Sequence, residues 1–109
     1  MEKEIITYNE DLIKLARIAK ALSHPARLQI LNILSKQHCC YSGNIAGEFP
    51  IALSTLSQHL KELKDSGLIR GEINHPNIKY CIDPTNWRVA NELFGAFFKE
   101  YFEVTDCKI

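Results

Sequence analysis

Two adjacent cysteines are the residues of this chain with the clearest capacity for chemistry. They lie in His38-Cys39-Cys40, and the sequence has four cysteines in all. Neighbouring thiols do not readily close an unstrained disulfide, but both can bind one soft ion, because thiolates favour soft metals. A helix N-terminus or an imidazolium nearby lowers the pKa of a thiol and favours this capture. The alternative for each cysteine alone is that it packs as a small buried hydrophobic residue.

A second set of polar residues lies between Pro50 and Ile69. Leucines at three- and four-residue spacing form one stripe of a helix predicted over Leu53–Ser66; they are Leu53, Leu56, Leu60 and Leu63. The other faces carry short polar side chains rich in hydrogen-bond donors: Ser54, Thr55, Ser57, Gln58, His59 and Lys61. Gly67 is the expected C-terminal stop. One side of this helix should pack in the core while the other remains available for recognition.

Three helices are expected before this stretch, over about 9–22, 26–36 and 42–48. The first has apolar residues over a wide arc, which indicates burial against a second surface such as another subunit. The second follows Ser23-His24-Pro25 and should bury Leu28, Ile30, Leu31, Ile33 and Leu34. Ser42 is the expected N-cap of the third. A short helix, a turn and a longer amphipathic helix are typical of a helix-turn-helix, whose second helix enters the major groove of DNA.

After Gly67 the apolar pattern changes to a period of two. The runs 69–73 and 78–82 alternate, and Asn74-His75-Pro76-Asn77 has turn chemistry, so we expect a hairpin. A last helix begins at Pro84 and carries many aromatic residues through Phe102. This apolar surface is too large for one small domain and indicates an interface. We interpret the first and last helices as a dimerisation layer; the alternative is a larger intramolecular core.

Composition and charge limit the class of protein. The 109 residues fit a single domain, 1–109. The N-terminus lacks the apolar segment of a signal peptide and no run is long enough to cross a membrane, so we expect a cytoplasmic protein with reduced thiols. Net charge is zero, which at first argues against nucleic acid. However, every charge between Leu12 and Gly47 is positive; these are Lys14, Arg17, Lys20, Arg27 and Lys36.

From about Leu15 to Tyr80 the sequence resembles the ArsR/SmtB (arsenic-repressor) family of bacterial transcriptional repressors. Three blocks in order carry the resemblance: Ala21-Leu22-Ser23-His24-Pro25-Ala26-Arg27-Leu28, Leu56-Ser57-Gln58-His59-Leu60-Lys61-Glu62-Leu63 and Ser66-Gly67-Leu68-Ile69. The expected fold is mainly α with a small β-hairpin, a winged helix-turn-helix with five helices and a two-stranded antiparallel wing. The family implies a homodimer that binds a pseudo-palindromic double-stranded operator and releases it when an inducer binds.

The resemblance assigns DNA contacts to the helix over Leu53–Ser66. Gln58 can pair with adenine, Ser54, Thr55 and Ser57 can contact a base or a phosphate, and Lys61 can neutralise a phosphate. His59 either contacts a base, fixes a phosphate or caps the helix pair. In the hairpin, whose tip lacks the arginines common in family wings, Arg70 and Lys79 are candidates for backbone contacts.

The inducer implied by the family is commonly a thiophilic metal or metalloid. The best-known family site has Cys-x-Cys where this chain has Tyr41 to Gly43, and the zinc site of other relatives needs histidines, none of which follows His75. Cys39 and Cys40 are therefore the candidate ligands, with Cys107 as a third, for arsenic(III), antimony(III) or cadmium. The same thiols would suit a sensor of oxidants or persulfides. Cys81, between Tyr80 and Ile82, is expected to pack.

These patterns predict a dimeric DNA-binding repressor with no obligatory cofactor, no membrane partner and no enzymatic activity. Alternatives within the fold are a redox or persulfide sensor and a ligand-independent regulator. A small thiol enzyme using Cys39 and Cys40 is disfavoured, because the sequence has no Cys-x-x-Cys motif and no parallel-sheet pattern. A winged helix that binds only proteins is a further alternative, against which the polar face of the predicted recognition helix argues.

Overall fold

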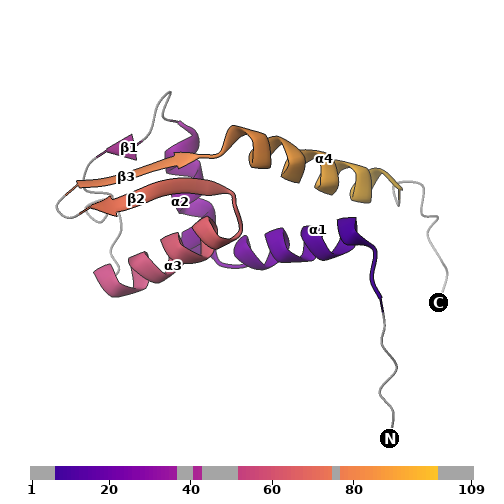
Figure 1. The fold of residues 1–109 in the computed structure, drawn as a ribbon, viewed down its shortest axis with the longest axis horizontal. Helices are drawn as coiled ribbons and strands as arrows, with labels where there is room; N and C mark the ends of the chain where they lie inside the picture. Colours follow the sequence, from indigo (N-terminus) through magenta and orange to yellow (C-terminus); the bar gives the residue numbers. More distant parts are fainter. Residues whose placement is uncertain (1–6, 37–40, 43–51, 75–76, 101–109) are drawn as a thin grey trace, which may run out of the picture.

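The computed structural model describes residues 7–36, 41–42, 52–74 and 77–100. The elements in these ranges are α1 (Glu10–Ala21), α2 (Pro25–Ser35), β1 (Tyr41–Ser42), α3 (Leu53–Asp65), β2 (Ile69–Asn74), β3 (Asn77–Ile82) and α4 (Pro84–Glu100). The β2–β3 hairpin and α3 occupy one end of the molecule, and the free ends of α1 and α4 occupy the other (Figure 1). The predicted fold class, a mainly helical winged helix-turn-helix, is confirmed.

Local sequence explains where the helices begin and end. The Asn9 side chain accepts a hydrogen bond from the Asp11 amide (2.7 Å) and caps α1. His24 caps α2 by accepting from the Ala26 amide (3.0 Å), and Pro25 follows in the first turn, where its missing N–H costs nothing. Beyond the C-terminus of α3, Gly67 has φ +84°, which glycine adopts readily. The predicted stop after the recognition helix is therefore confirmed.

The sheet contains one strand more than expected among the described residues. The predicted hairpin is present, with Ile69 opposite Ile82 and Gly71 opposite Tyr80. Strand β1 adds to its other edge, giving the antiparallel order β1-β3-β2. Ser42, the expected N-cap of a helix, lies in this strand opposite Lys79. The rest of that predicted helix, 43–48, falls outside the described residues, so four of the five expected helices are seen.

The core lies where α2, α3 and the sheet meet the end of α1. Its fully or nearly fully buried members are Ile18, Ala21, Ile30, Leu31, Leu34, Leu56, Leu60, Leu63, Leu68, Ile69, Tyr80 and Ala90. The expectation that Leu28 is buried is wrong, since 50% of it is exposed. The reason is helical geometry: Ile30, Leu31 and Leu34 form a single stripe, and Leu28 lies outside it.

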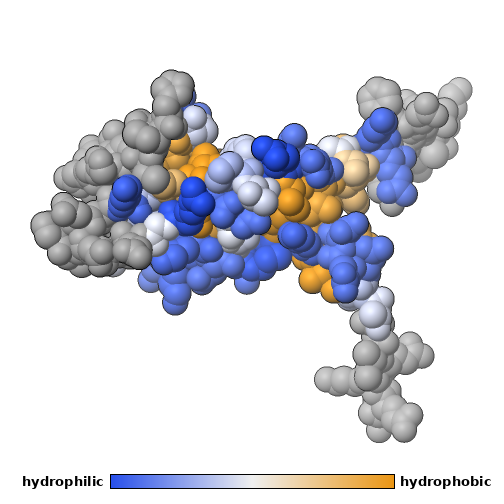
Figure 2. All heavy atoms as spheres, turned by 45° about the horizontal axis from the view of Figure 1, so that its top comes forward, coloured by the Kyte–Doolittle hydropathy of each residue, from blue (hydrophilic) through white to orange (hydrophobic). Residues whose placement is uncertain are grey.

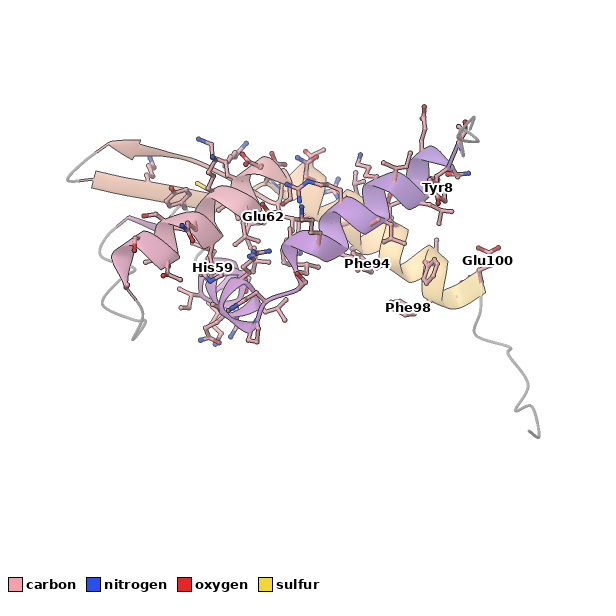
Figure 3. The ribbon with its side chains drawn as sticks, turned by 90° about the horizontal axis from the view of Figure 1, so that it is seen from below. Tyr8, His59, Glu62, Phe94, Phe98 and Glu100 are labelled. Carbon is pink, nitrogen blue, oxygen red and sulfur yellow. The ribbon has the colours of Figure 1, made fainter. Side chains whose placement is uncertain are left out.

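Helices α1 and α4 lie side by side (Figures 1 and 3), and they leave large apolar side chains uncovered. On α1, Ile13 is 55% exposed, and on α4, Phe98 is 66% exposed. Leu12 and Phe97 are also exposed. Figure 2 shows apolar residues gathered between these helices and polar residues along the part that contains α3. Within the described ranges, none of the helices is long and apolar enough to span a bilayer.

Candidate nucleic-acid interface

The outer face of α3 is polar and accessible. Ser54, Thr55, Gln58 and Lys61 are exposed, and Ser57 is half-buried. The first turn of the helix contains no acidic residue, and Ala52 at the N-cap position makes no side-chain capping bond. Helix N-termini carry unpaired N–H groups and a partial positive charge, both of which favour phosphate. Four of the predicted DNA-contacting residues thus share one accessible surface with a helix start suited to anions.

The opposite face of α3 is anchored by leucines. Leu56, Leu60 and Leu63 belong to the core, together with Ile30 and Leu34 of α2 and Ile69 of β2. Burying leucine side chains of this size contributes about 1.5–3 kcal/mol each. The helix therefore has a fixed orientation on α2 and the wing, and its polar residues are presented by packed structure rather than by a loop.

His59 is positioned differently from the other polar residues of α3. It is only 8% exposed. Its Nδ1 accepts a hydrogen bond from Nε of Arg27 at 3.2 Å, and its ring lies 4.4 Å from the ring of His24. Burial, aided by His24 and Arg27, lowers the pKa of His59 below its usual 6.5. The residue faces α2 (Figure 3), and the geometry favours a helix-pairing role over contact with a base.

A second polar contact joins α3 to α1. Arg17 donates from Nη1 to Oε1 of Glu62 at 2.9 Å, and both side chains are only partly exposed. Arg17 is one of the positive residues between Leu12 and Gly47, but its guanidinium is paired within the molecule. Arg27 likewise donates to His59 and to the Lys20 carbonyl (3.0 Å). The contacts of Arg17 with Glu62 and of Arg27 with His59 join residues 45 and 32 positions apart, so local sequence patterns do not predict them.

The wing carries its two candidate cations on one face. Arg70 pairs with Cys81 and Glu72 with Lys79 in the register, so alternation places Arg70 and Lys79 on the same side of the hairpin. Both are exposed, whereas Tyr80 on the other side is buried. The two positive side chains therefore lie together on one exposed face of the wing.

The candidate thiol ligands Cys39, Cys40 and Cys107 fall outside the described residues. Among the residues that are described, His, Cys, Asp and Glu form no group of three or more able to hold a metal ion. Cys81 is disulfide-bonded, which corrects the expectation that it is a packed thiol. Its side chain is half-buried and lies on the same face of the hairpin as Arg70.

Comparison with known proteins places the chain among transcriptional regulators. The model of the bacterial regulatory protein, arsR family, matches residues 24–70. The HTH-type transcriptional regulator YgaV of Escherichia coli (strain K12) is 37% identical over 67 residues, which are 62% of this chain and 68% of YgaV. The arsenical resistance operon repressor of Staphylococcus xylosus is 39% identical over 56 residues, 51% of this chain and 53% of that protein.

Solved structures agree with this assignment. A crystal structure of an ArsR family transcriptional regulator matches with a TM-score of 0.68 and 26% identity, covering 94% of this chain and all (100%) of that one. Reduced HlyU from Vibrio cholerae matches with a TM-score of 0.61 and 26% identity, covering 84% and 93%. These relatives are regulators rather than enzymes, as the sequence predicted. The chain belongs to the arsR family of bacterial regulatory proteins and is a winged helix-turn-helix DNA-binding transcriptional regulator.

Proposed function

We propose that the protein is a dimeric, sequence-specific repressor in the cytoplasm, whose α3 enters the major groove of an operator and which an inducer acting on its thiols releases. The observation that carries the DNA-binding part is the two-sided character of α3. Leu56, Leu60 and Leu63 are buried, while Ser54, Thr55, Gln58 and Lys61 are exposed. A rigid helix with short polar side chains is the usual means of reading base edges.

The proposed contacts divide into base recognition and phosphate binding. Gln58 has an amide that can pair bidentately with adenine, so we assign it the main base contact. Ser54, Thr55 and Ser57 have hydroxyls for bases or phosphates, and Lys61 has an ammonium for a phosphate. On the wing, Arg70 and Lys79 would bind the DNA backbone. His59 is assigned to the support of α3, because its Nδ1 is engaged by Arg27.

Dimerisation through α1 and α4 follows from the apolar surface these helices leave uncovered. A hollow of about 330 Å³ lies between them, lined by apolar residues that include Leu12, Leu15, Leu93 and Phe97. With the exposed Ile13 and Phe98, this surface is larger than the scattered apolar residues normal on a monomer. A second copy covering it would place two α3 helices on one duplex, as a pseudo-palindromic operator requires.

Replacing Gln58 tests the assignment of the recognition helix. Gln58→Ala should weaken binding to an operator duplex about 5- to 150-fold, the loss expected for one good bidentate pair, and leave nonspecific binding almost unchanged. Fluorescence anisotropy with operator and scrambled duplexes measures both. The matched control is Gln29→Ala, an exposed glutamine on α2, which should bind as the parent does. Equal losses on operator and scrambled DNA would contradict a base contact by Gln58.

For the inducer, we propose a thiophilic metal or metalloid, arsenic(III), antimony(III) or cadmium, held by Cys39 and Cys40 with Cys107 as a third ligand in the reduced protein. These three are the only cysteines of the chain besides Cys81, so a disulfide at Cys81 within the chain occupies one of them and must be reduced before the ion binds. Thiolates are the ligands that these soft ions prefer. Similarity to an arsenical resistance operon repressor supports this choice. A sensor of oxidants or persulfides is the second candidate, favoured by the disulfide at Cys81 and the similarity to reduced HlyU.

Replacing both adjacent cysteines tests whether these thiols sense the inducer, and the choice of reagent distinguishes a metal from a persulfide. Arsenite, antimonite or cadmium should release the parent protein from its duplex. Cys39→Ser with Cys40→Ser should abolish release while DNA affinity stays within about twofold, since neither thiol is among the proposed DNA contacts. Native mass spectrometry after exposure to each metal or to a persulfide donor identifies the adduct. Release by persulfide alone would replace the metal proposal, and release of the double variant by every reagent would remove these thiols from the mechanism.

A further inference from the structure

One arginine of α2 joins three helices of the DNA-binding unit. Arg27 donates from Nη1 to the carbonyl of Lys20 at 3.0 Å and to that of Ala21 at 3.5 Å, both at the C-terminus of α1. From Nε it donates to Nδ1 of His59 on α3 at 3.2 Å. Carbonyls at a helix C-terminus have no partners within the helix and carry partial negative charge. The guanidinium is thus held in place by α1 while it contacts α3.

The contact with α3 depends on the protonation state of His59. Neutral imidazole accepts a hydrogen bond only at the nitrogen that carries no proton, so Nδ1 must be unprotonated here. Protonation would direct an N–H at the N–H of Arg27 and add a second positive charge beside it. The ring of His24 lies against the same imidazole, with the ring centres 4.4 Å apart and the planes tilted by 42°. Glu62, which follows His59 by three residues on α3, is paired with Arg17.

We infer that Arg27 is a positioning residue that fixes α3 through neutral His59, so that operator binding requires His59 to be unprotonated. This inference rests on the proposed function of α3. Two possible roles of His59, contact with phosphate and support of α3, predict opposite dependences of operator affinity on pH. A histidine that contacts phosphate binds DNA more tightly as it gains a proton, whereas a histidine that must accept from Arg27 binds more weakly.

Two substitutions separate these roles. His59→Asn keeps an acceptor oxygen near the position of Nδ1 but cannot titrate in this range, so it retains the contact at every pH. Arg27→Lys keeps the positive charge but lacks the planar fork that serves α1 and α3 together. A phosphate-contacting Arg27 would be replaced by lysine with little loss, whereas a positioning Arg27 would not.

The first readout is the imidazole itself. In ¹⁵N-correlated NMR spectra of the whole protein, His59 should be the Nε2–H tautomer at neutral pH and should titrate below 6.5, in keeping with its lowered pKa. In Arg27→Lys the Nδ1 resonance should shift as its hydrogen bond is lost. A His59 that carries its proton on Nδ1, or that titrates at or above 6.5, would overturn the inference.

The second readout is operator affinity between about pH 7.5 and about pH 5, measured by anisotropy at constant ionic strength. The affinity of the parent protein relative to His59→Asn should fall below the pKa of His59, approaching about tenfold per pH unit, as linkage to one proton requires. Arg27→Lys should bind more weakly than the parent at neutral pH with an unchanged circular dichroism spectrum. Parallel pH profiles for the parent and His59→Asn, or full affinity in Arg27→Lys, would reject the positioning role.

Failure of the proposed function gives a different result. A parent protein that binds no duplex at any pH would reject operator binding by α3, and the role of Arg27 in it, even with the predicted tautomer and titration of His59 observed. Loss of the NMR signature with operator binding intact would reject only the inference about Arg27 and His59.

Discussion

Gln58 and His59 are neighbours in sequence with opposite surroundings. One helical step turns the side chain by about 100°, so Gln58 is exposed on the polar face while His59 is buried against α2. A sequence pattern treats both as polar residues of one face. Only the partners of His59, Arg27 at 3.2 Å and the ring of His24, distinguish a supporting residue from a recognition residue.

The buried His59 predicts how stability depends on pH. Its pKa is lowered in the folded protein from the usual 6.5, chiefly by burial, so the unfolded chain binds this proton more readily than the folded one. The contribution of His59 to stability is therefore complete above 6.5 and is lost as the pH falls through that value toward the folded pKa.

Urea unfolding of the parent and His59→Asn at a series of pH values measures this contribution. As the pH falls below 6.5, the free energy of unfolding of the parent should decrease relative to that of His59→Asn. A difference that stays constant through this range would show that His59 has an ordinary pKa in the folded state.

The four helices that the structure describes were predictable to within about two residues, because each has a periodic apolar stripe and recognisable end residues. Asn9, Pro25 and Gly67 mark ends that the structure confirms. Strand β1 was not predictable, since two residues are too few to show alternation and the pairing of Tyr41 with Tyr80 is made across the fold. The disulfide at Cys81 differs from the expectation of reduced thiols, because that expectation followed from a cytoplasmic location and not from a pattern in the sequence.

The wing depends on a glycine at the position opposite a buried tyrosine. A Cβ built on Gly71 would lie 2.8 Å from Cδ1 and 3.0 Å from Cα of Tyr80, closer than carbon atoms pack. Gly71→Ala should therefore destabilise the protein by about 1–3 kcal/mol, because the backbone of β3 must shift. The midpoint and slope of urea unfolding measure the loss.

Gly95→Ala is the control for that substitution. A Cβ at Gly95 in α4 meets nothing within 4 Å among the described residues, and alanine favours a helix over glycine by about 1 kcal/mol. This variant should be as stable as the parent or more so. A Gly71→Ala protein with unchanged stability would show that β2 and β3 are farther apart than the structure has them.

At the scale of the whole molecule, the two ends have different characters. The part that contains α3 presents polar side chains, and apolar side chains gather between α1 and α4 (Figure 2). A net charge of zero conceals this separation, which explains why overall composition is a poor guide to DNA binding here. The predicted thiol site stays a prediction, since Cys39, Cys40 and Cys107 lie outside the described residues.

The stoichiometry and salt dependence of operator binding test the central claim most directly. A duplex selected from a randomised library should bind two chains by native mass spectrometry, because the apolar faces of α1 and α4 pair. Its affinity should fall about 10³- to 10⁵-fold between about 50 and 200 mM salt when six to ten phosphates are contacted. One chain per duplex, or an affinity that does not change with salt, would contradict a dimer that presents two α3 helices to DNA.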